Sequence, residues 1–182
     1  MYTFFDGPPE AILIGNAEYK VNTDFRMWLE ISEILSDTSL SDRDKILCLL
    51  MRGYKDKIPP DINDAIDGLL LFMSQNKKGG KTEKSTPVIS FSDDEGVIYA
   101  SFLQQYGIDL FKENLHWWKF LMLLGALDEK TSFMRIVGYR SVNLENIKDK
   151  LQKSFYRKMK NKYRINRDIS DSDIADVFEG CC

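Results

Sequence analysis

The chain has 182 residues, of which 43% are hydrophobic, 12% aromatic and 29% charged, and its net charge is −3. This composition is typical of one soluble globular domain and excludes a disordered chain or a coiled-coil rod. The longest uninterrupted apolar run, Phe120 to Leu124, is far shorter than the roughly 20 residues of a membrane span. The first residues also lack the basic and apolar regions of a secretory signal. We therefore expect a cytoplasmic protein without membrane association.

The first 22 residues carry the only clear strand pattern. Residues 11–14 and 17–21 are short runs that contain apolar side chains, and Gly15-Asn16 lies between them. Because both of these turn residues tolerate a positive φ angle, the pattern predicts a β-hairpin with a two-residue turn. An isolated hairpin is only marginally stable, so we expect it to pack against another part of the fold.

From Thr23 onward, apolar residues recur at spacings of three and four, as they do in amphipathic helices. Each of the first three such segments begins with serine, threonine or aspartate, whose side chains cap the unpaired N–H groups of a helix start. The pattern predicts helices over residues 23–36, with Thr23 or Asp24 as the cap, and over residues 41–53 and 61–73. Gly53 is a suitable C-terminal end for the second.

The middle of the chain changes in composition. Residues 75–87 contain no large apolar side chain and are rich in Lys, Gly, Ser and Thr, so we predict a flexible internal loop over residues 75–90. Beyond it, Ser92 and Glu95 have the spacing of a capping box, which predicts the start of a fourth helix. Gly107 is expected to end that helix.

The second half of the chain is predicted to hold three more helices. Residues 115–127 are apolar on nearly every face, as in the buried centre of a bundle. A short helix is expected at about residues 132–137 and a long one at about residues 144–165. The predicted fold is mainly α, a compact helical bundle of about six to seven helices with a short N-terminal β-hairpin. It forms one domain over residues 1–165, followed by an acidic C-terminal tail at residues 166–182.

Few residues suit catalysis or metal binding. The chain has one histidine, His116, and three cysteines, which are too few donors for a zinc site built from several His and Cys ligands. The segment Gly79 to Thr82 resembles the end of a phosphate-binding loop. However, Gln75 stands where that motif requires glycine, and the segment follows a predicted helix rather than a strand. We expect a protein that is not an enzyme and that has no cofactor and no metal.

Charge is distributed unevenly along the chain. Residues 148–167 carry nine Lys or Arg against one Asp, a net charge of +8, and residues 168–182 carry five acids and no base, a net charge of −5. Residues 1–147 therefore hold −6. A basic helix with interleaved aromatic residues suits nucleic acid or an acidic partner protein, and it also suits the solvated faces of a packed helix. We hypothesise that the acidic tail folds back and shields the basic helix until a client competes for it.

Trp117 and Trp118 are neighbours in a predicted helix. Adjacent helix positions differ by about 100° in direction, so the two side chains cannot point at the same core layer. We expect one tryptophan in the core and the other at a boundary or partner surface, where tryptophan is enriched as an anchor. The candidate partner-binding residues are these two and the basic and aromatic residues of the last helix: Trp117, Trp118, Phe155, Tyr156, Arg157, Lys158, Lys160, Lys162, Tyr163 and Arg164.

Four sequence blocks occur in a distinctive order. They are Asn22 to Trp28 after the hairpin, Ile98 to Leu110 with Tyr-Gly-Ile-Asp-Leu, Leu115 to Phe120 with Leu-His-Trp-Trp-Lys-Phe, and Gly138 to Ser141 with Gly-Tyr-Arg-Ser. Over about residues 10–165, this order resembles the bacteriophage gene-product-fifteen family. These are small proteins encoded in the tail modules of long-tailed phages and prophages of Gram-positive bacteria. The internal loop and the acidic tail have no family pattern to match.

The resemblance implies a tail assembly chaperone that binds and solubilises the tape measure protein and helps to recruit tail tube subunits. Its partners would be the tape measure protein and the tail tube protein in the host bacterial cytoplasm, and it would be absent from the mature virion. The sequence leaves self-association open. The alternative is a nucleic-acid-binding regulator that uses the basic helix 144–165, although nucleic acid is the less favoured partner. We expect the client to contact that helix and the surface around Trp117 and Trp118.

Overall fold

The computed structural model describes residues 6–75 and 87–165. Most of the predicted internal loop and the whole predicted acidic tail lie outside these residues. The fold is mainly α with an N-terminal hairpin, as predicted. Within the described residues the elements are β1 (Ala11–Ile14), β2 (Ala17–Lys20), α1 (Phe25–Ser36), α2 (Asp42–Gly53), α3 (Ile62–Met73), α4 (Phe91–Tyr106), α5 (Trp117–Gly125), α6 (Ser132–Ser141), the 3₁₀ helix η1 (Leu144–Asn146) and α7 (Lys150–Lys162).

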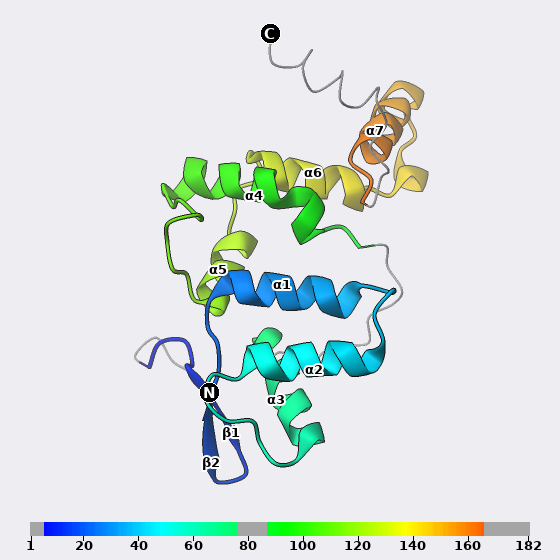
Figure 1. Ribbon diagram of the computed structural model, residues 1–182. Helices are drawn as coiled ribbons and strands as arrows, with labels where there is room; N and C mark the ends of the chain where they lie inside the picture. The colour runs from blue at the N-terminus through cyan, green and yellow to red at the C-terminus, as the bar shows by residue number, and fades with distance from the viewer. Residues whose placement is uncertain (1–5, 76–86, 166–182) are drawn as a thin grey trace.

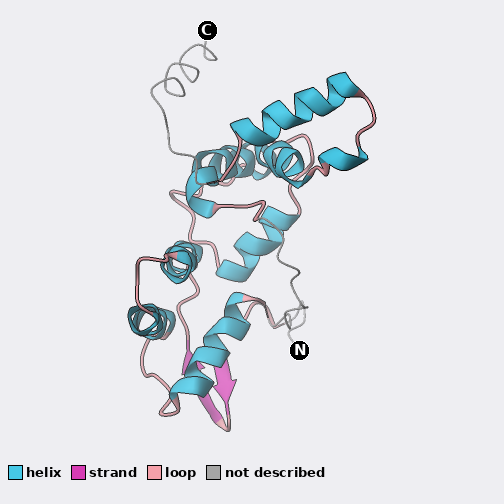
Figure 2. Cartoon of the chain, turned by 90° about the vertical axis from the view of Figure 1, so that its right-hand side faces the viewer, coloured by secondary structure: helices cyan, strands magenta, loops and turns pink. Residues whose placement is uncertain are grey.

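The elements are arranged along one long axis of the molecule. The hairpin lies at one end beside α3, the helices α1 and α2 run side by side above it, and α4 and α6 form the next layer (Figure 1). Helix α5 lies between these two layers. Helix α7 packs on α6 at the end of the molecule opposite to the hairpin (Figure 2).

The hairpin forms as predicted. Strands β1 and β2 pair antiparallel, with Ala11 opposite Lys20, and Gly15 in the turn has a φ of +60°. The hairpin packs on α3 at Gly68, where an added Cβ would lie only 3.2 Å from the side chain of Ile14. The absence of a side chain at Gly68 therefore lets the strands approach α3 closely.

The first three helices begin where the sequence predicts, because their caps form. The side chains of Asp24, Ser41 and Asp61 accept backbone N–H groups of the first turns of α1, α2 and α3. Each cap satisfies donors that a helix start leaves unpaired. The predicted ends at Ser36, Gly53 and Met73 are also confirmed.

Helix α4 begins earlier than predicted. The capping box predicted at Ser92 is wrong, because the cap is Ser90, whose hydroxyl accepts the N–H of Asp93 at 3.2 Å. In return, the carboxylate of Asp94 accepts the N–H of Ser90 at 3.1 Å. The predicted end at Gly107 is confirmed, and this glycine has a φ of +68°.

The single long helix predicted over residues 144–165 is wrong. Helix α6 runs on to Ser141, four residues beyond its predicted end, and residues 144–146 form only a 3₁₀ turn. Helix α7 then starts at Lys150, because the carboxylate of Asp149 accepts the N–H of Gln152 at 2.7 Å and caps a new helix there. An apolar stripe that continues across two short elements has the same sequence pattern as one long helix.

The core is dominated by aromatic side chains. Trp28, Phe102, Phe120 and Phe133 are each at most 1% exposed. The ring of Phe120 stacks on that of Phe102, with ring centroids 5.3 Å apart. These four residues belong to four different helices, α1, α4, α5 and α6 in that order. This core therefore joins both layers of helices.

One ion pair lies inside this structure. The guanidinium of Arg140 donates to the two carboxylate oxygens of Asp94 at 2.6 and 2.8 Å, and the two side chains are 8% and 2% exposed. Arg140 also donates to the carbonyl oxygens of Val88 and Tyr163. This one side chain therefore connects the segment before α4, helix α4 itself and the end of α7.

None of the helices in the two described ranges is both long and apolar enough to span a membrane.

Candidate functional site

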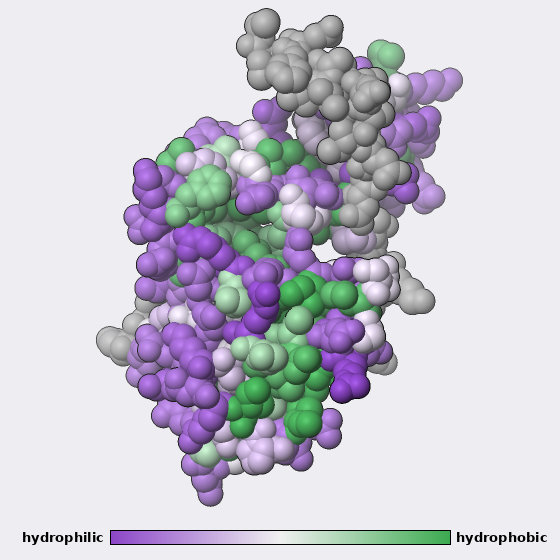
Figure 3. All heavy atoms as spheres, viewed as in Figure 1, coloured by the Kyte–Doolittle hydropathy of each residue, from purple (hydrophilic) through white to green (hydrophobic). Residues whose placement is uncertain are grey.

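A groove of about 590 Å³ lies between α1 and α4. We call it the α1/α4 groove, and Figure 3 shows hydrophobic residues in the hollow between these parts of the molecule. Its residues come from α1, α4, the loop after α4, and α5: Phe25, Arg26, Leu29, Glu30, Glu33, Ile34, Phe91, Ser92, Glu95, Ile98, Tyr99, Leu110, Phe111 and Phe120.

The floor of the groove is rigid and apolar. Phe25 and Phe120 are 4% and 0% exposed, and their rings stack with centroids 4.7 Å apart. Above them, Leu29 and Ile34 on the α1 side are only half-buried. The groove thus presents apolar surface that solvent reaches and that an apolar ligand would cover.

Arg26 joins α1 to the loop after α4 in the lining of the groove. Its guanidinium donates to the carbonyl oxygens of Leu110 at 2.7 Å and Glu113 at 2.9 Å, and it pairs with the carboxylate of Asp24 at 3.1 Å. These bonds hold the loop after α4 against the first turn of α1. Hydrogen bonds as well as apolar packing therefore hold this part of the groove lining in place.

The start of α1 is tied to the start of α5 as well. The N–H of Phe25 donates to the carbonyl of Leu115 at 3.1 Å, and the N–H of Trp117 donates to the carbonyl of Thr23 at 2.7 Å. These two bonds align the first turns of both helices, which place Phe25 and Phe120 in the floor of the groove.

Phe111 forms an exposed aromatic lip. It is 71% exposed, and its ring lies 4.6 Å from the ring of Tyr99 between centroids. The carboxylate of Asp109 accepts the N–H of Phe111 at 3.1 Å and pairs with Lys112, whose hydrogen bond lowers the pKa of that carboxyl group. This turn holds Phe111 at the edge of the groove, where its ring stays accessible.

The rim of the groove carries acidic side chains. Glu30, Glu33 and Glu95 are exposed there. Glu30 pairs with Arg52 from α2, whereas none of the ion pairs within residues 6–75 and 87–165 involves Glu33 or Glu95. The apolar groove therefore has a negative edge, which favours a ligand with positive charge beside its apolar face.

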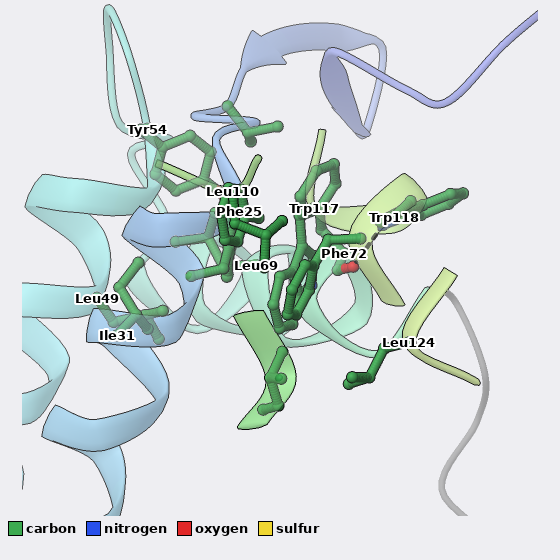
Figure 4. Close-up of a cluster of buried hydrophobic side chains, with 14 of the residues drawn as sticks. Phe25, Ile31, Leu49, Tyr54, Leu69, Phe72, Leu110, Trp117, Trp118 and Leu124 are labelled. Carbon is green, nitrogen blue, oxygen red and sulfur yellow. Dashed lines mark hydrogen bonds between the residues drawn. The ribbon is translucent and has the colours of Figure 1, made fainter. Parts of the chain in front are cut away.

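Both tryptophans of the predicted site are buried, so the prediction that one of them lies at a boundary or a partner surface is wrong. Trp117 is 2% exposed and Trp118 is 8% exposed. Their indole N–H groups donate to the carbonyls of Met73 at 2.9 Å and Phe72 at 2.8 Å, and Figure 4 shows the second of these bonds. The side chains leave α5 in different directions, as expected, but both reach the C-terminal end of α3, where carbonyl groups lack helical partners.

The aromatic residues predicted on the last helix gather around one ring of α6. The ring centroid of Tyr139 lies 6.2 Å from that of Phe155, 6.3 Å from that of Tyr156 and 5.8 Å from that of Tyr163. Phe155 is 49% exposed, and Tyr156 and Tyr163 are half-buried. This cluster attaches α7 to α6, and it lies on a different part of the fold from the tryptophans.

The predicted basic residues remain at the surface, with one exception. Arg157, Lys158, Lys162 and Arg164 are exposed, whereas Lys160 is half-buried and donates from Nζ to the carbonyl of Val142 at 3.0 Å. Helix α7 contains six Lys or Arg and no acidic residue. The partner-binding role of these residues stays a prediction.

The α1/α4 groove was not predicted from the sequence. Its residues come from four separate segments, and each segment shows only ordinary helical periodicity. One available signal was Phe111, which together with Leu110 interrupts an otherwise polar run from Asp109 to Asn114. Such a residue indicates a turn that holds an aromatic side chain for contact.

A comparison with known protein families finds a match to the family model described as Bacteriophage Gp15 protein, over residues 6–165. The matched range includes every helix and strand described above. No curated protein and no solved structure matches the chain.

Proposed function

Because this chain belongs to the bacteriophage Gp15 family, we propose that it is a tail assembly chaperone that binds and solubilises the tape measure protein and helps to recruit tail tube subunits. A tape measure protein is long, helical and prone to aggregate, so its chaperone needs a surface that covers apolar helix faces. The α1/α4 groove is the observation that carries this proposal.

The dimensions of the groove suit a helix. Its lining on α1 runs from Phe25 to Ile34, which is about 13 Å along the helix axis. A client helix laid along this wall would present about two turns to the floor, enough for anchors at the spacing with which an amphipathic helix binds a groove. The acidic side chains Glu33 and Glu95 would then lie beside the polar flanks of the client.

The test is co-expression of this protein with the tape measure protein encoded by the same phage. We expect the tape measure protein to be insoluble alone, and to be soluble and co-purify with the wild-type chaperone. Phe111→Asp should abolish co-purification because it puts a charge on the aromatic lip. Leu13→Asp is the matched control, because Leu13 on β1 is equally exposed, at 70%, but does not line the groove.

The outcomes separate the function from the surface. A tape measure protein that is equally insoluble with and without this protein would refute the chaperone function. Normal co-purification with the Phe111→Asp variant would instead leave the function standing and refute the groove as the client surface. Addition of tail tube protein to the soluble complex then tests recruitment, for which a ternary complex in gel filtration is the expected result.

The place of action follows from the same proposal. A chaperone that holds a client until the tail is built acts in the host cytoplasm and is absent from the mature virion. Mass spectrometry of purified virions should detect the tail tube protein and the tape measure protein but not this chain. Its presence at a fixed ratio to the tube protein would make it a structural component.

A further inference from the structure

Helix α7 has an outer face that combines apolar and basic side chains. Leu151, Phe155, Lys158 and Lys162 follow one another at spacings of four, three and four, so they share one face of the helix. Leu151 is 83% exposed and Phe155 is 49% exposed. Large apolar side chains on a basic helix are typical of a helix that docks into a groove.

The α1/α4 groove is complementary to this face. It offers apolar surface over a rigid aromatic floor, where Leu151 and Phe155 would be removed from water. The exposed acids Glu33 and Glu95 stand at its rim, and the outer face of α7 is basic. The two surfaces therefore both carry apolar side chains, and their charges are opposite in sign.

Helix α7 does not lie in the groove of its own chain. It packs on α6, where the ring of Tyr163 stacks on that of Tyr139 and Lys160 donates to the carbonyl of Val142. Arg140 also holds the carbonyl of Tyr163. The groove is lined by α1, α4, the loop after α4 and α5, and α7 lies beside α6 at one end of the molecule, so the two surfaces belong to different parts of the fold (Figure 1).

We propose that the outer face of α7 of one molecule docks in the α1/α4 groove of a second copy of the chain. The two contact surfaces differ, so the interface is head to tail, and a docked pair keeps one free groove and one free α7 for further copies. Such an interface builds an open chain of molecules or a closed ring.

This interface would also regulate access of a client to the groove, an inference that rests on the proposed function. A second copy and a client would occupy the same apolar surface, so they compete for it. Assembled copies would keep their grooves covered in the absence of a client, and a tape measure helix would displace α7. The interface itself needs no client and is tested without one.

The experiment uses the full-length chain and measures molar mass by light scattering after gel filtration, over a range of protein concentrations. The α7 variant is Leu151→Asp with Lys158→Glu, and the groove variant is Glu33→Lys with Glu95→Lys. All four residues are exposed. The wild-type mass should rise with concentration, whereas each variant alone should remain monomeric at every concentration.

Mixing the two variants is the decisive measurement. The α7 variant retains an intact groove and the groove variant retains an intact α7, so an equimolar mixture should form one interface and give a heterodimer of twice the monomer mass and no larger species. A control with Glu18→Lys and Lys130→Glu, two exposed charge reversals outside both surfaces, should assemble like the wild type.

Three results would overturn the proposal. They are a wild-type chain that stays monomeric at all concentrations, variants that assemble like the wild type, and a mixture that stays monomeric. Circular dichroism checks that each variant is folded, and Lys158→Glu and Glu33→Lys as single changes should weaken assembly in the same sense. These results do not depend on co-purification of the tape measure protein, so failure of either proposal is recognised separately.

Discussion

At the scale of single residues, the buried pair of Asp94 and Arg140 is a point where one substitution should be costly. Asp94→Ala would leave the guanidinium of Arg140, whose side chain is 8% exposed, without its carboxylate. Loss of one partner of a buried ion pair typically costs about 3 to 5 kcal/mol, and we expect the free energy of unfolding to fall by that amount. Urea denaturation followed by circular dichroism measures it.

The neighbouring residue provides the control. Glu95 lies in the same helical turn but is exposed and belongs to none of the ion pairs seen in the described ranges. Glu95→Ala should change the free energy of unfolding by less than about 0.5 kcal/mol. Equal effects of the two substitutions would show that the buried pair has no special part in stability.

His116 makes the fold sensitive to mild acid. Its Nδ1 accepts the N–H of Trp118 at 3.0 Å as the cap of α5, and its Nε2 lies 2.9 Å from the carbonyl of Pro9. This arrangement requires neutral imidazole with the proton on Nε2. Burial lowers the pKa of His116 below 6.5, more than the hydrogen bond to Pro9 raises it.

The sign of the pH effect follows from this lowered pKa. The unfolded chain binds the proton at a higher pH than the folded chain, so the stability is fully present above about pH 6.5 and decreases as the pH falls below it. His116 is the only histidine, so His116→Asn, which can still cap a helix, should remove the dependence between about pH 7 and pH 5.5. The test is to measure the thermal midpoints of the wild-type and His116→Asn proteins across that pH range. Parallel curves would show that His116 is not the cause of the pH dependence.

Individual residues also show where sequence reasoning stopped. The geometry of a helix correctly separates Trp117 from Trp118 by direction, but it does not show that α3 ends beside both of them. Arg140 has no local sequence signal beyond the Gly-Tyr-Arg-Ser block, although it is 9% exposed and holds three segments together. Whether such a polar or aromatic side chain is buried depends on a partner that is distant in the sequence. A local sequence pattern does not identify that partner.

At the scale of elements, two glycines in helices have opposite roles. A Cβ on Gly53, at the end of α2, would lie 2.6 and 2.8 Å from the two methyl groups of Leu69, which is 0% exposed on α3. Gly53→Ala should therefore lower the free energy of unfolding by about 1 to 3 kcal/mol through overpacking. In α4, a Cβ on Gly96 would meet no atom within 4 Å. Gly96→Ala should therefore raise the free energy of unfolding by about 0.5 to 1 kcal/mol.

The two substitutions are chemically identical and are compared by thermal or urea unfolding. If both stabilised the protein, helix propensity alone would explain the effects, and the close packing of α2 on α3 at Gly53 would be excluded. If both destabilised it, the surroundings of Gly96 would be more crowded than described. Only opposite signs agree with the packing.

The elements that sequence predicted best are those with local signals. The caps at Asp24, Ser41 and Asp61 lie directly before apolar periodicity, and all three helices follow them. The sequence did not show that the last predicted helix is divided into η1 and α7. An apolar stripe continues across both elements, and the stripe alone does not show that Asp149 caps a new helix within it. The aromatic packing of α7 on Tyr139 stabilises the divided arrangement.

At the scale of the whole molecule, the groove could not be predicted because it results from the placement of α1 against α4 and α5. Its floor unites Phe25 and Phe120, which are 95 positions apart in the chain. Each of these residues has a simple core pattern in the sequence. Only the tertiary arrangement leaves the side chains above them half-covered and thereby creates the groove.

The polarised charge of the chain leads to a prediction at the same scale. The net charge of +8 over residues 148–167 directly precedes −5 over residues 168–182. If the acidic segment shields the basic one, a chain that ends at Arg167 should bind single-stranded DNA or heparin more tightly than the full-length chain at low salt. The gain should disappear as salt rises, by about one unit of log-log slope for each phosphate neutralised.

A full-length variant with its five tail acids replaced by amides separates charge from length. It should bind like the truncated chain if charge is the cause, whereas binding unchanged from wild type in both variants would discard shielding by the tail. Fluorescence anisotropy with a labelled oligonucleotide measures all three proteins. Tight, sequence-dependent binding by the full-length chain would favour a nucleic-acid-binding regulator, because a chaperone whose α7 contacts protein has no need to select a base sequence.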